Sequence, residues 1–427
     1  MGRLKSIINN LSNNAYLFAI VTKVLSVVLV MLYSIVYSRY FGPEIKGTGD
    51  VVLNYADFIK IIACLGMYQA YPYFKKCRGI EVYSEFINNT FGMFGVYLAL
   101  AIISVLVIKP SLMTSAIIIL VPIMYAIQQL NYVVLVERPK TRNSAQVLLD
   151  SIDIVIVVIL MFIFQASEML CIVYLIVRHL IHLIVAVINL KVSIISIRPT
   201  LKMARKYISY GWIPMLTILF MEINYKADII MMEGFSVSRA SIGIYSLGLT
   251  LAQKIWLIPD ALKDILLSKL ANGKSLDEVK KVTRLSLFVV VVFIILLAII
   301  GKPAIVLLYG HDYEDAYLVL LILLVGVLGM VFYKMIYSYN VVNGKRIINL
   351  VLLGIAAAIN IVVNAVLIPP LGMIGAAIAS TLSYFLCGIL FLFTFCRKNS
   401  VRFKDMVLIN KEDIDNLKSI FKNKSAR

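Results

Sequence analysis

Long apolar runs follow one another along nearly the whole chain, separated by short polar segments. Each run is close to the length of about 20 residues that an α-helix needs to cross the ~30 Å hydrocarbon core of a bilayer. The runs lie at about 14–38, 48–74, 88–108, 112–136, 145–165, 168–190, 208–232, 239–265, 284–301, 316–339, 347–368 and 373–396. The pattern predicts an all-α polytopic membrane protein with about 12 transmembrane helices.

Basic residues gather in alternate loops of this map. Most of the 41 lysines and arginines fall in the segments that would share a side with the N-terminus, above all in the loop 191–207 and after Cys396. By the positive-inside rule, both termini are predicted to be cytoplasmic, in the cytoplasmic (inner) membrane. The net charge of +18 then reflects membrane topology, and we expect no nucleic-acid partner.

The loop 191–207 divides the runs into two sets of six, and weak internal similarity supports this division. The outer turn at Phe41–Gly49 is similar to Phe235–Gly243, and at this offset Lys60 falls on Lys254. Internal repeats with a binding site between them are a general plan of transporters. We therefore expect two six-helix lobes around a central cavity. The predicted domains are an N-terminal lobe at 1–206, a C-terminal lobe at 207–396 and a basic cytoplasmic tail at 397–427.

Charged side chains interrupt these apolar runs near their middles. A charge at membrane depth costs about 2.5–3.5 kcal/mol even on lenient insertion scales, so such residues usually face a bundle interior or a wet cavity and mark function. The charges in question are Lys23, Asp57, Lys60, Arg178, Glu222, Lys226, Asp228, Lys254 and Lys334.

The deeper cations are the candidate substrate-binding residues: Lys23, Lys60, Arg178, Lys226 and Lys254. A cationic cavity suits a diphosphate, which favours charge-assisted donors, whereas a cavity for cationic drugs would need net acid. The alternative interpretation is mutual neutralisation, because Asp57–Lys60, Glu222–Lys226 and Asp260–Lys263 each share one helix face.

Two acids, Asp57 and Asp228, are the candidate ion-coupling carboxylates for Na⁺ or H⁺. The competing interpretation makes both of them structural counter-ions. Asp150 and Asp153 are expected near the inner boundary of their span, and Lys334 either reaches the inner surface or stays at depth.

His179 and His182 lie beside Arg178 in the middle of a span. They are placed either to relay protons or to make packing hydrogen bonds between helices. The sequence leaves both roles open.

Motifs for chemistry are missing from the sequence. Gly344-Lys345 has Tyr339 where a phosphate-binding loop needs its first glycine and Arg346 where it needs a hydroxyl. The five cysteines and three histidines have no metal-binding or redox spacing, and the loops are too short to hold a catalytic domain. We expect no enzyme activity, no cofactor and no metal site.

Several segments in order resemble the polysaccharide or oligosaccharide flippase family (Wzx-like), part of the multidrug/oligosaccharidyl-lipid/polysaccharide exporter superfamily. They are Ser38–Glu44, Lys226–Ile230, Ser241–Ser246, Leu307–Gly310, Tyr339–Lys345, Asn360 with Asn364, and Ile368–Ala377. The resemblance implies a MATE-like fold and outward flipping of polyprenyl-diphosphate-linked oligosaccharide units for O-antigen, lipopolysaccharide or capsule biosynthesis. It also implies membrane lipids, a polysaccharide polymerase and a chain-length regulator as partners.

Two alternatives share this fold. One is a multidrug or cation antiporter. The other is a lipid II flippase, although members of that family usually have additional C-terminal spans that this sequence lacks.

Overall fold

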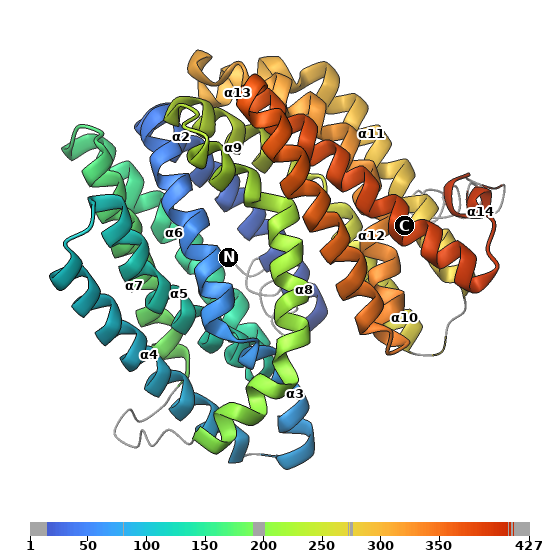
Figure 1. Cartoon of the computed structure of the whole chain (residues 1–427), viewed down its shortest axis with the longest axis horizontal. Helices are drawn as coiled ribbons and strands as arrows, with labels where there is room; N and C mark the ends of the chain where they lie inside the picture. The colour runs from blue at the N-terminus through green and yellow to red at the C-terminus, as the bar shows by residue number, and fades with distance from the viewer. Residues whose placement is uncertain are drawn as a thin grey trace, which may run out of the picture. The chain divides into compact units, whose positions relative to one another are not determined.

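The computed structural model describes residues 15–79, 81–190, 201–271, 273, 276–408, 410 and 413, and this part of the chain consists of helices joined by short connections, with no strand (Figure 1). The helices are α2 (Ala15–Cys64), α3 (Met67–Arg78), α4 (Glu81–Ile108), α5 (Leu112–Glu137), α6 (Pro139–Ile163), α7 (Glu168–Leu190), α8 (Leu201–Gly234), α9 (Arg239–Lys254), α10 (Leu257–Ala271), α11 (Leu276–Tyr309), η2 (His311–Tyr313), α12 (Ala316–Val342), α13 (Arg346–Asn399) and α14 (Phe403–Val407).

Nine helical segments of the described chain are long and apolar enough to cross a membrane. Two of them contain a break: α2 at Gly42 (φ 66°) and α13 at Gly372 (φ 55°). Glycine takes a positive φ without steric penalty. At each break one span therefore turns directly into the next, with no long loop between them. The helix α8 of 34 residues is not among the nine, and it carries the charges Glu222, Lys226 and Asp228. When α2 and α13 are each counted as two spans and α8 is added, the helices follow the expected map of spans.

The chain divides into two compact units, Met1–Leu219 and Phe220–Arg427, which meet inside α8. In the first unit, α2 packs against α5, α6 and α7, and α5 packs against α4 and α7. In the second unit, α12 packs against α9, α10, α11 and α13. Each unit therefore has its own core.

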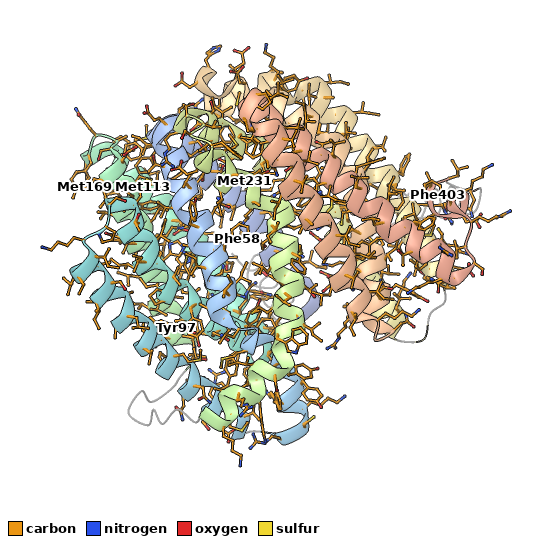
Figure 2. The ribbon with its side chains drawn as sticks, viewed as in Figure 1. Phe58, Tyr97, Met113, Met169, Met231 and Phe403 are labelled. Atoms are coloured by element: carbon orange, nitrogen blue, oxygen red, sulfur yellow. The ribbon has the colours of Figure 1, made fainter. Side chains whose placement is uncertain are left out.

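Aromatic contacts hold the first unit together. Tyr97 of α4, labelled in Figure 2, meets Tyr125 of α5 edge-on with ring centroids 5.1 Å apart. Its hydroxyl also donates to the carbonyl of Ala63 on α2 (3.2 Å). Three helices are thus joined at one buried point, in the bundle that carries Lys60 and Arg178.

The same local break occurs in both units, shortly after the lysines that the internal similarity aligns. After Lys60, α2 ends at Cys64 and α3 begins at Met67; after Lys254, α9 ends and α10 begins at Leu257. The intervening residues Leu65 and Gly66 have positive φ, whereas Ile255 remains near helical values. The two units thus share a pattern of a helix, a short break and a second helix.

Candidate functional site

Arg178 belongs to a buried charge cluster of the first unit. Its Nε and Nη2 atoms both lie 2.8 Å from Oδ2 of Asp153. The Asp153 side chain is only 3% exposed, whereas that of Arg178 is 21% exposed. The guanidinium also stands 4.9 Å from the ring centroid of Tyr33, and such a cation–π contact helps to hold it in place.

His182 completes this cluster. Its Nε2 atom lies 3.1 Å from Oδ1 of Asp153, the carboxylate oxygen that Arg178 does not use. Arg178 and His182 are four residues apart on α7, so they project from one face of the helix toward Asp153 on α6. The side chain of the neighbouring His179 turns elsewhere, because its Nδ1 lies 2.7 Å from the carbonyl oxygen of Leu175.

The expectation that Asp150 and Asp153 lie near the inner boundary of their span stays a prediction, but both side chains are buried within the protein. Because α6 begins at Pro139, both residues lie near the middle of the helix. Asp150 accepts hydrogen bonds from Ser26 and from Gln146 (2.8 Å). The apolar run alone placed the start of this helix too late, since its first turns are polar.

The expected local pair of Asp57 and Lys60 is present on α2. Lys60 Nζ lies 2.5 Å from Asp57 Oδ1, and both side chains are partly exposed. The residues are three apart, a spacing that brings side chains together on a helix. The cation and the carboxylate therefore neutralise each other in this structure.

Among the described acids of the second unit, Asp228 is the most buried, at 1% exposure. Its Oδ2 accepts hydrogen bonds from the hydroxyls of Tyr245 on α9 and Ser380 on α13 (2.8 Å). Its Oδ1 accepts from the backbone N–H of Ile229 (2.9 Å). None of these donors, which are the Asp228 partners found in the described chain, carries a positive charge. An ionised carboxylate is costly in such a place, and a proton or a bound cation would relieve the cost.

Further polar groups are buried on the helices around Asp228. Asn224, one turn earlier on α8, accepts a hydrogen bond from Ser383 Oγ of α13 (2.6 Å). On α13, Asn364 Nδ2 donates to Asn360 Oδ1 (3.0 Å). Among the described residues, Asn360 Nδ2 and Asn364 Oδ1 have no hydrogen-bond partner. Buried polar atoms are usually paired, so these two amides are an exception within an apolar helix.

Lys334 is bound to an acid on a neighbouring helix. It is buried and its Nζ lies 2.7 and 2.8 Å from the two oxygens of Asp260. The same ammonium stands 5.1 Å from the ring centroid of Trp256. The expected partner of Asp260, Lys263, is farther away at 3.4 Å. The long-range pair is shorter than the local one because α10 and α12 pack together.

The candidate cations are distributed over both units: Lys23, Lys60 and Arg178 on the first, Lys226 and Lys254 on the second. Lys226 Nζ lies 3.5 Å from Glu222 Oε2, so the expected local pair is present. Lys23 is exposed on the protein, whereas Lys60, Arg178, Lys226 and Lys254 are partly covered.

Sequence reasoning did not assign several residues that complete these sites. Asp153 and Asp260 are the partners of Arg178 and Lys334, and Tyr245 and Ser380 are the donors to Asp228. A membrane-depth acid without a partner on its own helix was the available signal for Asp153. Its true partners lie on another helix, which a single sequence does not reveal.

In the described residues, no group of three or more His, Cys, Asp or Glu side chains is arranged to hold a metal ion. The oxygen atoms around Asp228 could, by their chemical type, bind a proton or a hard cation.

No protein-family model and no curated protein matches this sequence. Solved structures do match the fold. The lipid II flippase MurJ, in an inward closed conformation, has a TM-score of 0.71 at 15% identity, covering 91% of this chain and 89% of its own. A multidrug resistance MATE family transporter of the MOP superfamily, facing inward, has a TM-score of 0.65 at 11% identity, covering 90% and 98%.

A third similar structure is that of a MOP superfamily transporter from Pyrococcus furiosus, for which a binding pocket of reverse polarity suggests a different function. Its TM-score is 0.59 at 12% identity, covering 89% of this chain and 94% of its own. At such identities the likeness concerns the fold, and the Wzx-like resemblance of the sequence stays a prediction. The chain is an all-α polytopic membrane protein with the MATE-like fold that these transporters share.

Proposed function

We propose that this protein is a flippase that moves a polyprenyl-diphosphate-linked oligosaccharide across the cytoplasmic membrane, for the synthesis of a surface polysaccharide such as O-antigen, lipopolysaccharide or capsule. The observation that carries the proposal is Arg178. It is a guanidinium in the middle of a span, partly exposed although its counter-ion Asp153 is almost fully buried. A guanidinium that remains accessible at membrane depth is suited to bind a phosphate by charge-assisted hydrogen bonds.

The other candidate cations extend this argument. Lys23, Lys60, Lys226 and Lys254 add positive charge inside apolar spans on both units, and such charges are rarely retained without a function. The fold is that of transporters, one of which is a lipid II flippase. We therefore propose transport and not catalysis, with no cofactor. The central cavity expected from the sequence stays a prediction, as do the two lobes that divide at 206/207.

We further propose that an ion gradient drives the transport, with Asp57 and Asp228 as coupling carboxylates. Substrate diphosphate would compete with Asp57 for Lys60 and leave Asp57 to take up Na⁺ or H⁺. Asp228 already lacks a positively charged partner among the described residues that donate to it. Ligand-dependent conformational change requires different affinities in the two states, and a carboxylate that exchanges its partner supplies such a difference.

The proposed setting is the inner membrane, with both termini in the cytoplasm, as the distribution of basic loops predicts. A polysaccharide polymerase and a chain-length regulator are the proposed protein partners. Reporter fusions at each terminus test the topology: an active cytoplasmic reporter at both ends supports it, and an active periplasmic reporter at either end contradicts it.

A multidrug or cation antiporter is the second candidate, and one observation favours it. Asp228 is a buried acid without a basic donor in the described chain, and a carboxylate of this kind attracts cationic substrates as well as ions. The two functions predict different results on deletion of the gene: loss of surface polysaccharide for the flippase, and greater drug sensitivity with normal polysaccharide for the antiporter. A lipid II flippase would instead be required for the cell wall.

The deciding experiment reconstitutes the protein in vesicles and follows the outward movement of a fluorescent polyprenyl-diphosphate oligosaccharide. We expect Arg178→Gln and Lys60→Gln each to reduce the initial rate, because each removes a candidate phosphate ligand. The matched control Lys76→Gln removes an equal charge from an exposed position at the end of a span and should leave the rate unchanged. Equal rates for all four proteins would contradict the proposed binding residues.

A further inference from the structure

The carboxylate of Asp153 is divided between two basic side chains of the same helix. An arginine that binds a carboxylate in a fork-to-fork manner uses both oxygens. Here both contacting nitrogens of Arg178 go to Oδ2, and Oδ1 is left to His182 Nε2 at 3.1 Å. The geometry therefore couples Arg178 to the charge state of His182 through one shared acid.

Proton uptake by His182 would change the electrostatic balance of the cluster. To donate to Asp153, neutral His182 must carry its hydrogen on Nε2, so an added proton goes to Nδ1 and both nitrogens become donors. With His182 neutral, Asp153 and Arg178 cancel each other. With His182 protonated, the three side chains carry one net positive charge in a region of low dielectric, where charges interact strongly.

The other groups around the cluster do not provide this control. His179 lies beside His182, with ring centroids 6.1 Å apart, but it bonds to a backbone carbonyl. Tyr33 of α2 and Tyr174 of α7 surround the guanidinium, and Asp57 of α2 acts on His179 from a distance. On α6, Asp150 is hydrogen-bonded by Ser26 and Gln146. On α5, the acid Glu137 is at the helix end, bonded to Tyr71 and Lys75.

We propose that His182 is a proton-controlled positioning residue for Arg178. When His182 takes up a proton from water, it satisfies Asp153 and makes Arg178 available to an anionic group of the substrate; when it loses the proton, Asp153 holds Arg178 again. The inference deepens the proposed function, because it rests on Arg178 as a phosphate ligand. Histidine suits this role because its charge changes near neutral pH.

Binding of inorganic pyrophosphate to the purified full-length protein tests the inference. Affinity is measured between about pH 8 and pH 5.5 for the wild type, Asp153→Asn, His182→Gln, His179→Gln and Arg178→Gln. Pyrophosphate itself takes up protons in this range, but equally for every protein, so only differences between variants count. The affinity that remains in the Arg178→Gln variant measures the binding that does not involve Arg178.

At pH 8 we expect Asp153→Asn to bind on the order of tenfold more tightly than the wild type, because its Arg178 is already released, and the difference should vanish by pH 5.5. One linked proton changes an affinity by at most tenfold per pH unit. The His182→Gln variant should bind weakly at every pH, since its Arg178 stays held. The His179→Gln control should follow the wild type.

Two results would overturn the proposal: equal affinities of the wild type and Asp153→Asn at every pH, or a wild-type pH response in His182→Gln. If flipping of the lipid-linked oligosaccharide fails while this binding pattern holds, the proposed function falls and the inference stands. If flipping occurs but this binding pattern is absent, the inference falls and the proposed function stands.

A measurement on the wild type avoids any variant that folds poorly. The chain has only 3 histidines, so a carbon label at imidazole Cε1 gives three NMR signals, assigned with His179→Gln and His311→Gln. Linkage is reciprocal: if protonation of His182 favours pyrophosphate binding, pyrophosphate must raise the pH at which His182 titrates. An unchanged titration of His182 in saturating pyrophosphate would refute the inference.

Discussion

Asp153 and Asp228 are two aspartates on long apolar helices, nearly equally buried in different units, yet their surroundings differ in kind. Asp153 is bound by Arg178 and His182. Asp228 is bound by two hydroxyls and one backbone N–H. Asp153 is thus compensated by basic side chains, whereas the described donors to Asp228 are all neutral.

This difference separates two tasks that the sequence alone could not distinguish. A carboxylate paired with arginine stays ionised and controls where the arginine can bind. A carboxylate among neutral donors is expensive to ionise, so its charge depends on a proton or a cation supplied from outside. On this view Asp153 governs the binding of anions, and Asp228 is the better candidate for ion coupling. The predictions below test this contrast.

The largest effect is expected for Asp228→Asn. The amide keeps the shape of the side chain but cannot exchange a proton or hold a cation by charge, so the imposed gradient should no longer accelerate flipping. Coupling free energies between sites typically correspond to about 5–150-fold, and we expect a loss in that range. Initial rates in vesicles with and without pH or Na⁺ gradients measure it.

The matched comparison is Asp57→Asn, which changes a partly exposed acid already paired with Lys60. A reduction in gradient dependence with this variant as well would assign coupling to both acids. If both variants retain the wild-type response at normal protein levels, neither acid couples transport and both are counter-ions.

The second prediction concerns the stability of the first unit. Among the described residues, Arg178→Gln leaves the buried Asp153 with His182 as its one basic partner. Removal of one partner from a buried ion pair costs about 3–5 kcal/mol, and because Arg178 is partly exposed we expect the lower end. Thermal unfolding in detergent at several pH values measures it.

The double variant Arg178→Gln with Asp153→Asn gives the control for this prediction. It removes the uncompensated charge, so it should be more stable than Arg178→Gln alone. A double variant as unstable as the single one would show that packing, and not charge compensation, holds this cluster together.

Asp413 of the second unit is also compensated by an arginine, so it allows the effect of compensation to be tested outside the first unit. Arg284 of α11 binds it through Nε (2.5 Å) and Nη2 (3.0 Å), and Arg284 Nη1 donates to the carbonyl of Asp405 (2.7 Å). Burial opposes ionisation of Asp413, but the hydrogen bonds from Arg284 and Asn410 outweigh it, so the pKa of this carboxyl lies below its usual range.

A group whose pKa is lowered by folding stabilises the folded state above its unfolded pKa, about 3.9 for aspartate, and this stabilisation is lost as the pH falls through the folded value. The contact of Asp413 with Arg284 should therefore be constant near neutral pH and weaken below about pH 4. Arg284→Gln should loosen it by about 1.5–3 kcal/mol, the usual contribution of hydrogen bonds to charged groups. Hydrogen exchange in residues 403–408 measures the change, and unaltered protection would contradict the clamp.

The smallest effect is expected for Ser380→Ala, which removes one neutral donor from Asp228. A single hydrogen bond contributes about 0.5–1.5 kcal/mol, so gradient dependence should persist, with less than a tenfold change in the ion concentration for half-maximal rate. The control is Ser383→Ala, whose hydroxyl bonds to Asn224 instead. A complete loss of coupling in Ser380→Ala would make the hydroxyl itself an ion ligand.

The sequence by itself determined the helices, their approximate number and the local ion pairs. Apolar runs give spans directly, since a bilayer allows no backbone polar group to go unpaired. Side chains three or four residues apart meet on any helix, and so Asp57–Lys60 and Glu222–Lys226 were predicted correctly. The apolar runs also identified Arg178 and Asp228 as charges within membrane spans.

Only the tertiary structure decided which charges are compensated. Asp153 with Arg178, Asp260 with Lys334, and Ser380 with Asp228 join different helices, and helix periodicity has no information about which faces of distant segments meet. The helix α6 begins before the apolar run because its first turns are polar, and apolar sequence alone does not mark such turns as helical. A charge in a span can be recognised one helix at a time, but its counter-ion is set by packing, because Coulomb energy depends on distances in space and not along the chain.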